Sequence, residues 1–236
     1  MVPADFLDFI RSCSNVDFLF VDDGSSDNTP EILGMLDREG NGRVAVLKLG
    51  VNSGKAEAVR RGGLHCISSG KYEYIGYWDA DLATPLSEIN RFLAVFSSKP
   101  DVSMVIGSRI RKMGSRVERI WYRHYLGRFF ATAASVMLKM PIYDTQCGAK
   151  IMRAGFAAPL FNEPFNVKWL FDIELFSRAI YELGNEGVKK AVYEIPLDAW
   201  KDIAGSKLRL VNFLATPVQL FWIWKLYNLP VKGNRR

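Results

Sequence analysis

The chain contains the stretch Tyr74-Ile75-Gly76-Tyr77-Trp78-Asp79-Ala80-Asp81, in which an apolar run ends on two carboxylates. A short apolar run bounded by polar residues is typical of a buried β-strand followed by a loop. Carboxylates one residue apart at such an end can both turn toward a divalent cation, because Mg²⁺ and Mn²⁺ prefer oxygen ligands. A cation bound in this way keeps positions open for substrate phosphates. By itself the triplet Asp79-Ala80-Asp81 gives weak support, since most such triplets are solvated turns.

A second acidic strand end lies upstream. The apolar run Phe18-Leu19-Phe20-Val21 leads into Asp22-Asp23-Gly24-Ser25-Ser26-Asp27. In an open α/β sheet the C-terminal ends of the strands border one crevice. Two acidic strand ends therefore face one ligand, and together they predict a nucleotide-sugar site.

Short apolar runs alternate with helical patterns through the first half of the chain, which is typical of βαβ units. The expected strands are 17–21, 44–49, 74–78 and 102–106, and the expected helices between them are 29–38, 54–68 and 84–96. After about Gly107 we expect a long amphipathic helix 118–140, a strand 150–152, a helix 171–183, a strand 191–197 and a C-terminal pair of helices.

Three Thr-Pro dipeptides indicate helix starts at Thr29-Pro30, Thr84-Pro85 and Thr216-Pro217. Threonine can cap the free amides, and proline at the first helical position loses no hydrogen bond. Gln219 completes a capping box with Thr216, so the last helix is expected to start there.

The 236 residues are enough for one domain with a substantial core. A hydrophobic content of 49% and a charged content of 24% are ordinary for a folded soluble protein. The three cysteines, Cys13, Cys66 and Cys147, are too few and too scattered for a disulfide framework or a zinc site. We therefore expect reduced thiols.

The net charge of +6 is unevenly distributed. One segment contains Arg109, Arg111, Lys112, Arg116, Arg119, Arg123 and Arg128. On a helix, Arg116, Arg119 and Arg123 fall within about 60° of one another. No nucleic-acid-binding motif accompanies this charge, so nucleic acid is not an expected partner. An anionic membrane surface or a phosphorylated substrate fits it, and a solvated helix face is the alternative.

The acidic strand ends belong to a longer, ordered set of motifs. Its members are Val21 to Thr29, Asn52-Ser53-Gly54-Lys55, Asp79-Ala80-Asp81, Gly107-Ser108-Arg109, Asp144 to Lys150, Trp169 to Leu175 and Gly205-Ser206-Lys207-Leu208. The set resembles glycosyltransferase family 2, whose members have the GT-A fold, a Rossmann-like α/β fold with a mixed sheet flanked by helices. Within it, the chain is most similar to the branch that glycosylates polyprenyl phosphates, the dolichyl-phosphate β-glucosyltransferases, and more distantly to dolichol-phosphate mannose synthases.

The resemblance implies a metal-dependent, inverting hexosyltransferase. It moves a hexose from a nucleotide-diphospho-sugar, with UDP-glucose expected, to a dolichyl or undecaprenyl phosphate. On the donor side, Asp23 would accept hydrogen bonds from uracil, and Lys55 would lie near the nucleotide. Asp79 and Asp81 would hold Mg²⁺ or Mn²⁺ against the diphosphate, which Lys207 would also reach.

On the acceptor side, the resemblance implies that Arg109 and Arg123 bind the phosphate, because the guanidinium fork suits phosphate oxygens. Arg119 and Asp144 belong to the same group, with Asp144 either structural or arginine-orienting. Asp172 is either a general base or a residue that orders Arg109 or Arg123. A phosphate acceptor is already an oxyanion, so the reaction depends on positioning and charge stabilisation.

Two features depart from the family pattern. Members normally begin with a strand that ends in a Pro-x-Tyr-Asn-Glu-like segment under the nucleotide, whereas this chain starts at Met1-Val2-Pro3-Ala4, just past it. We therefore expect the sheet to lack the usual first strand. Ala83 stands where some mannose synthases have a glutamine ligand, so the metal is expected to rely on Asp79, Asp81 and phosphate oxygens.

We divide the chain into residues 1–205, the glycosyltransferase domain, and residues 206–236, amphipathic helices with a basic tail. The stretch 213–227 is rich in aromatic residues and suits the headgroup region of a membrane. A helix docked on the core is the alternative. The apolar runs are too short or too interrupted to span a bilayer, and no signal peptide is expected. The predicted location is the cytoplasm, peripheral to the cytoplasmic face of a membrane.

Three other functions are alternatives to this prediction. A family 2 transferase that glycosylates a sugar hydroxyl would need Asp172 as a true base. A haloacid dehalogenase-type phosphatase would need threonine where Ala83 stands, which disfavours it. A non-enzymatic nucleotide-sugar-binding remnant is compatible with the missing first strand.

Overall fold

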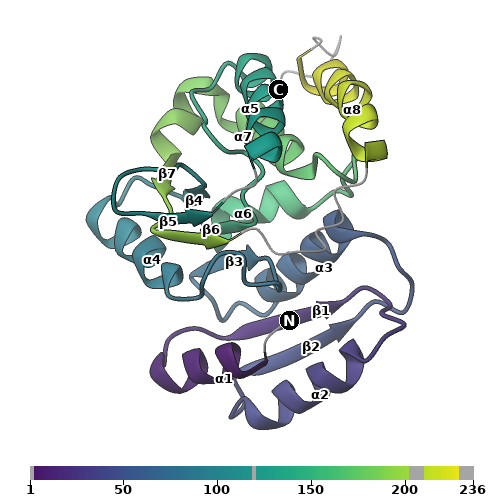
Figure 1. Ribbon diagram of the computed structural model, residues 1–236, viewed down its shortest axis with the longest axis vertical. Helices are drawn as coiled ribbons and strands as arrows, with labels where there is room; N and C mark the ends of the chain where they lie inside the picture. The colour runs from purple at the N-terminus through teal and green to yellow at the C-terminus, as the bar shows by residue number, and fades with distance from the viewer. Residues whose placement is uncertain (1–2, 119–120, 202–209, 229–236) are drawn as a thin grey trace.

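The computed structural model describes residues 3–118, 121–201 and 210–228 (Figure 1). Its helices are α1 (Pro3–Ser12), α2 (Thr29–Glu39), α3 (Lys55–Ser68), α4 (Glu88–Ser98), α5 (Trp121–Leu138), α6 (Ala154–Phe161), α7 (Phe171–Ala191) and α8 (Leu210–Asn228). Its strands are β1 (Phe18–Asp22), β2 (Val44–Lys48), β3 (Tyr74–Trp78), β4 (Met104–Ser108), β5 (Arg116–Glu118), β6 (Ala149–Arg153), β7 (Val192–Pro196) and β8 (Ala199–Lys201).

A four-stranded sheet with the order β3-β6-β4-β7 forms the centre of the protein. Strand β6 is antiparallel to both of its neighbours, and β4 is parallel to β7. Strands β1 and β2 form a separate parallel pair, and β5 and β8 form another. In the part of the chain that the structure describes, no backbone ladder joins β1 to β3, but helix α3 contacts both strands (Figure 1).

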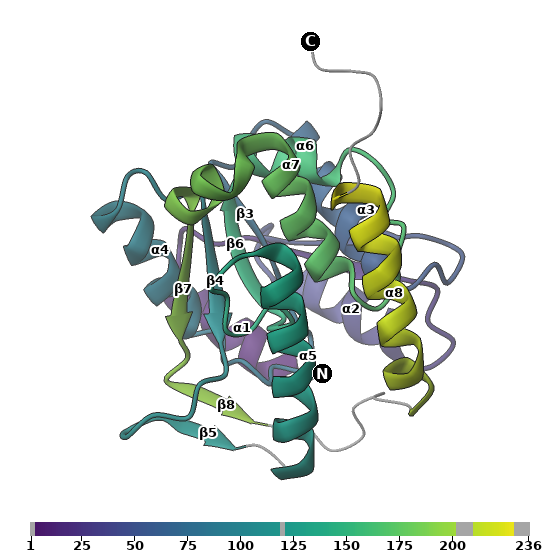
Figure 2. The same ribbon diagram turned by 90° about the horizontal axis from the view of Figure 1, so that it is seen from above.

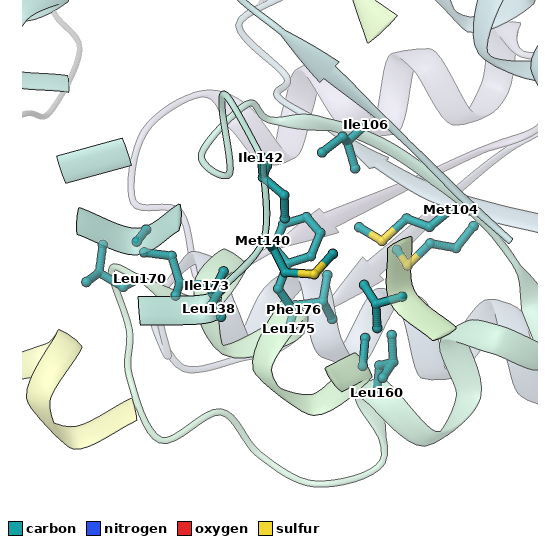
Figure 3. Packing of buried hydrophobic residues seen from close by; sticks show 14 of the residues in the cluster. Met104, Ile106, Leu138, Met140, Ile142, Leu160, Leu170, Ile173, Leu175 and Phe176 are labelled. Carbon is teal, nitrogen blue, oxygen red and sulfur yellow. The ribbon is translucent and has the colours of Figure 1, made fainter. Parts of the chain in front are cut away.

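The side chains of the central sheet alternate between two cores, because successive residues of a strand point to opposite faces. On β6, Met152 packs into one core and Ile151 into the other. The first core includes Met104, Ile106 and Phe176, all completely enclosed (Figure 3). Helices α5, α6 and α7 contribute to this core, whereas α4, α1, α2 and β1 contribute to the second. Figure 2 shows α4 on one side of the sheet and α5 and α7 on the other.

The predicted strands and helices of the first half are present, mostly within two residues of their predicted bounds, and β3 has the predicted bounds. The start predicted for α4 at Thr84 is wrong. The helix begins at Glu88, and the segment before it forms a turn in which the Glu88 N–H donates to the Pro85 carbonyl at 3.2 Å. Helix α7 has a non-helical residue at Gly184, with φ of 70°, directly after the predicted end at 183.

The helix predicted to start at Thr216 is also different in the structure. Helix α8 runs from Leu210 through Thr216-Pro217, so the capping box is wrong, and one helix stands where a pair was expected among the described residues. The Gln219 amide oxygen instead accepts hydrogen bonds from the backbone N–H groups of Trp169 and Leu170, both at 3.2 Å. This side chain is used for a tertiary contact with the segment before α7.

The predicted stripe of arginines on one helix does not form as expected. Arg116 lies in strand β5, where its backbone N–H donates to the Asp198 carbonyl at 2.7 Å. Helix α5 begins only at Trp121, so Arg116 cannot share a helical face with Arg123. Pairing of β5 with β8 determines the conformation here, and a local helical period does not reveal that pairing.

Candidate functional site

The polar ends of several strands meet at one edge of the central sheet. Strand β3 leads into Asp79, β4 leads into Arg109, and β6 begins directly after Gly148. Because β6 runs antiparallel between β3 and β4, its first residues lie beside the last residues of its neighbours. The sheet topology therefore brings Asp79, Arg109 and the loop from Asp144 to Gly148 to the same edge.

The two aspartates at the end of β1, Asp22 and Asp23, have different contacts. Asp22 is buried and accepts a hydrogen bond from the Ser25 N–H at 2.9 Å. This contact closes the turn after β1. The carboxylate of Asp23 accepts hydrogen bonds from the N–H groups of Ser53 and Gly54 at 2.8 and 2.6 Å. Asp23 thus ties the end of β1 to the loop before α3, and its contact with uracil remains a prediction.

Lys55, the first residue of α3, extends to the end of β3. Its Nζ lies 2.5 Å from Oδ1 of Asp79. Partial withdrawal from water lowers the pKa of Lys55, but the carboxylates of Asp79, Asp172 and Asp81 outweigh this effect, so the pKa is raised. Lys55 is therefore a permanent positive charge beside the carboxylate pair, and half of its side chain is exposed.

The carboxylate pair fits a hard divalent cation shared with a diphosphate. The Asp79 side chain is 36% exposed, and Asp81 is exposed and accepts a hydrogen bond from the Ala83 N–H at 3.0 Å. Within the described residues, no group of three or more His, Cys, Asp or Glu side chains could hold a metal ion. Two carboxylates suit a cation whose remaining ligands are phosphate and water oxygens, as Mg²⁺ often has.

Arg109 and Asp144 form a bidentate ion pair at the end of β4. The Arg109 Nε and Nη2 atoms lie 2.6 and 2.7 Å from the two carboxylate oxygens. Burial lowers the pKa of Arg109, but the charge of Asp144 has the larger effect, so the pKa of Arg109 is raised. The guanidinium also lies over the Trp200 ring, 5.4 Å from its centre. The Glu194 carboxylate fixes the Asp144 loop, because it accepts hydrogen bonds from the backbone N–H groups of Tyr143 and Asp144 at 2.9 and 2.8 Å.

Asp172, the second residue of α7, has different partners from those predicted. Its Oδ1 lies 2.5 Å from the Nζ of Lys150, which is completely buried, and also accepts a short hydrogen bond from the Tyr77 hydroxyl. Burial, together with the charge of Asp172, raises the pKa of Tyr77 well above its usual value, so Tyr77 stays protonated as a donor. Asp144 pairs with Arg109, and the roles predicted for Asp172, a general base or a residue that orders Arg109 or Arg123, remain predictions.

Three residues predicted to bind phosphate groups have no described side chain. Arg119 and Lys207 are outside the described residues. Arg123 belongs to α5, but its side chain is not described. Their contacts with the acceptor phosphate and the donor diphosphate remain predictions.

Three residues of the site received no role from the sequence: Lys150, Tyr77 and Gly148. Lys150 carried a readable signal, because a lysine inside the apolar strand β6 needs a buried counter-charge. Tyr77 and Lys150 are directly opposite each other in the β3–β6 register. That register decides which residues meet, and the sequence alone does not show it.

Comparison with known proteins identifies the family. Residues 6–161 match the family model described as glycosyl transferase family 2, which is more than half of the chain. The chain belongs to glycosyl transferase family 2. Within this family 2 chain, the matched region runs from α1 to the end of α6 and includes Asp23, Asp79 and Arg109.

Curated relatives agree with the branch indicated by the motifs. The chain is 30% identical over 215 residues to a dolichyl-phosphate beta-glucosyltransferase of Dictyostelium discoideum, covering 86% of this chain and 62% of that protein. It is 32% identical over 216 residues to the enzyme of the same name from Drosophila melanogaster, covering 89% and 63%. This family 2 chain spans less than two thirds of the length of these relatives.

Solved structures confirm the predicted GT-A fold. The glucosyl-3-phosphoglycerate synthase of Mycobacterium tuberculosis in complex with phosphoglyceric acid matches with a TM-score of 0.64 and 16% identity, covering 97% of this chain and 76% of that one. The same enzyme in complex with Mn²⁺ and UDP-glucose gives a TM-score of 0.62 at 17% identity, covering 98% and 77%. At these identities the likeness concerns the fold alone.

Proposed function

We propose that this chain catalyses metal-dependent, inverting transfer of a hexose from a nucleotide-diphospho-sugar, UDP-glucose, to a polyprenyl phosphate. The observation that carries the proposal is the pairing of two charge types at one sheet edge. The carboxylates of Asp79 and Asp81 follow β3, and the partly buried guanidinium of Arg109 follows β4. The carboxylates suit a diphosphate bound through a cation. The guanidinium suits a phosphate acceptor.

On the donor side, Asp79 and Asp81 would hold Mg²⁺ or Mn²⁺. When bound, the cation neutralises charge on the departing diphosphate. Lys55 adds a fixed positive charge beside Asp79, close to where the diphosphate would bind. Asp23 binds the loop before α3 and so fixes the position of Lys55, the first residue of that helix.

On the acceptor side, Arg109 is held rigidly by Asp144, so its charge and orientation are set before any substrate arrives. An oxygen of the acceptor phosphate attacks the anomeric carbon of the hexose. The bond from this carbon to the UDP oxygen breaks, and UDP leaves with the electron pair. No proton has to be removed from a phosphate oxyanion, which agrees with an Asp172 carboxylate already engaged by Lys150 and Tyr77.

The named relatives and neighbours support both substrates. Relatives at about 30% identity are dolichyl-phosphate beta-glucosyltransferases. The neighbouring glucosyl-3-phosphoglycerate synthase has been solved with Mn²⁺ and UDP-glucose. The shared fold and the carboxylate pair make the same donor and metal our choice for this chain.

Helix α8 supports a site at a membrane surface. Its inner side is docked, since Ile223 is completely buried and the Tyr227 hydroxyl donates to Glu174 at 2.9 Å. Its outer side exposes Val218, Phe221 and Trp222, at positions i, i+3 and i+4 of one face. The inner side is thus docked on the core, and the exposed outer side supports our proposal that this side of the helix meets a membrane surface.

Exposed aromatic residues beside a cation suit the headgroup region of a bilayer. Lys225 continues the same face one turn on and lies 5.2 Å from the Trp222 ring centre. None of the described helices has the length and apolarity needed to cross a membrane. We propose peripheral attachment at the cytoplasmic face, where a polyprenyl phosphate headgroup is within reach.

The test is to incubate the protein with radiolabelled UDP-glucose, Mg²⁺ or Mn²⁺, and vesicles containing polyprenyl phosphate. We expect label in a lipid that releases glucose and polyprenyl phosphate on mild acid treatment. Label in a glycan or glycolipid without a sugar phosphate would replace the phosphate acceptor by a hydroxyl. UDP binding without any transfer would identify a nucleotide-sugar-binding remnant.

A further inference from the structure

Gly148 lies directly against the carboxylate of Asp79. The Asp79 N–H donates to the Gly148 carbonyl at 2.9 Å, which extends the β3–β6 ladder by one step beyond the Trp78–Ala149 pair. A Cβ atom added at Gly148 would lie 1.9 Å from Oδ2, 2.2 Å from Cγ and 2.5 Å from Oδ1 of Asp79. The whole carboxylate therefore occupies the space of a side chain at position 148.

The need for glycine at this position is steric. Gly148 is not among the residues with positive φ, so its backbone conformation is open to any residue. The three atoms nearest to the Cβ of an alanine at this position all belong to the Asp79 carboxylate. Since non-bonded heavy atoms stay about 3.5 Å apart, the carboxylate would have to swing away from the Gly148 backbone.

The carboxylate also has a charged partner. Lys55 Nζ contacts Oδ1 of Asp79 at 2.5 Å. Asp79 thus contacts the ammonium of Lys55, and its carboxylate lies against the bare Cα of Gly148. This arrangement fixes one rotamer of a side chain that is otherwise 36% exposed and free to turn.

We propose that Gly148 is a positioning residue for binding of the divalent cation and the donor diphosphate, acting through Asp79. This inference rests on the proposed function, in which Asp79 is a ligand of that cation. A shift of the carboxylate by one or two bond lengths moves a ligand oxygen out of reach of a cation that Asp81 and the diphosphate hold in place. Because glycine has no side chain, position 148 leaves room for the Asp79 carboxylate and thereby determines the position of this metal ligand.

The test measures binding of Mn²⁺ in the presence of UDP by electron paramagnetic resonance of the free ion, which needs no turnover. We expect Gly148→Ala to weaken Mn²⁺ binding at least tenfold. Gly155→Ala is the matched control, because Gly155 is the second residue of α6 and a Cβ added there meets no atom within 4 Å besides its chain neighbours and its own helix backbone. This control should bind Mn²⁺ as the wild type does.

A double-mutant cycle separates positioning of Asp79 from a general effect on folding. In an Asp79→Ala background the clash is removed, so Gly148→Ala should cause no further loss of Mn²⁺ affinity and no further fall in Tm. If Gly148→Ala alone does not fold, the double variant should regain folding. Wild-type Mn²⁺ affinity in Gly148→Ala, or an equal loss of Tm in both backgrounds, would overturn the inference.

The outcomes also separate this inference from the proposed function. Mn²⁺ and UDP binding that responds to Gly148→Ala, in a protein that transfers no hexose to polyprenyl phosphate, would overturn the proposed function and leave the inference standing. A wild-type protein that binds no Mn²⁺ with UDP would overturn both.

Discussion

The ammonium of Lys150 lies 2.5 Å from Oδ1 of Asp172, and both side chains are closed to water. Lys150 also donates to the Cys147 carbonyl at 2.6 Å, so this one cation ties the start of β6 to the first turn of α7. Asp172 at the N-terminal end of α7 is additionally favoured by the positive end of the helix dipole. The pair joins the sheet edge that carries the site to the helix that covers one face of the sheet.

Loss of Lys150 is expected to be strongly destabilising. Lys150→Met leaves the buried Asp172 carboxylate without a counter-charge, which typically costs about 3–5 kcal/mol. Urea unfolding would measure the loss. The double variant Lys150→Met/Asp172→Asn removes both charges and should recover part of it.

Lys189→Met is the matched control for this prediction, since Lys189 pairs with Glu186 at the surface. We expect its stability to be nearly unchanged, because exposed ion pairs contribute little. Equal stability of Lys150→Met and Lys189→Met would show that Lys150 and Asp172 are not a coupled buried pair.

The sequence predicted those parts of the fold that depend on neighbouring residues. Strand β3 and the carboxylates after it were readable because an apolar run and the polar residues that end it are adjacent in the chain. The acidic turn after β1 was readable for the same reason, and the Asp22–Ser25 contact is local.

What the sequence could not show depends on the pairing of distant segments. Arg116 has the spacing of a helical stripe, but its backbone pairs with β8, and this long-range ladder determines its conformation. The contacts of Lys150 with Asp172 and of Gly148 with Asp79 require the β3–β6 register, which a shift of one residue would change completely. A sequence motif predicts that such residues belong to one site, but it does not predict which of them contact each other.

Divalent cation dependence is tested by removing one carboxylate. Asp81→Asn should abolish Mg²⁺- or Mn²⁺-dependent transfer, because the departing diphosphate loses its neutralising cation. Excess chelator should do the same to the wild type, and added Mn²⁺ should restore its activity. Full activity of the wild type in chelator would refute a metal requirement.

Uridine recognition is tested at the loop after β1. Asp23→Ala should weaken UDP binding by about 1–3 kcal/mol, the usual loss for a charged hydrogen bond. Titration calorimetry measures this. Asp27→Ala is a control in the same loop, since Asp27 accepts a local hydrogen bond from the Thr29 N–H at 3.0 Å. Equal affinity for UDP and GDP would count against a uridine donor.

The outer face of α8 is tested with vesicles of neutral and anionic phospholipid. Phe221 and Trp222 are 57% and 49% exposed, so replacing both by serine should leave the fold intact and lower the bound fraction in sedimentation severalfold. Tyr181→Ser is the control, because Tyr181 is an equally exposed aromatic residue, 66%, on α7. An equal fall in vesicle binding for both proteins would contradict a specific role for α8.

The two transferase mechanisms differ in what they require of Asp172 and of the arginines. A hydroxyl acceptor must lose its proton to a base. The Asp172 carboxylate is the candidate from the sequence, yet Lys150 and Tyr77 already engage its Oδ1. A lipid phosphate needs no base but needs positive charge, which Arg109 supplies at the sheet edge and Arg123 is predicted to supply from α5.

Kinetics with polyprenyl phosphate therefore decide between the two acceptors. Arg123→Ala should raise the acceptor KM or lower kcat/KM by at least tenfold while UDP affinity stays nearly unchanged. Arg123→Lys should recover only part of the loss, because a point charge replaces a bidentate fork. Asp172→Asn, assayed on its folded fraction, should keep measurable turnover. An inactive but folded Asp172→Asn together with an unaffected Arg123→Ala would assign the reaction to a hydroxyl acceptor, since only that reaction depends on a base and does without the second arginine.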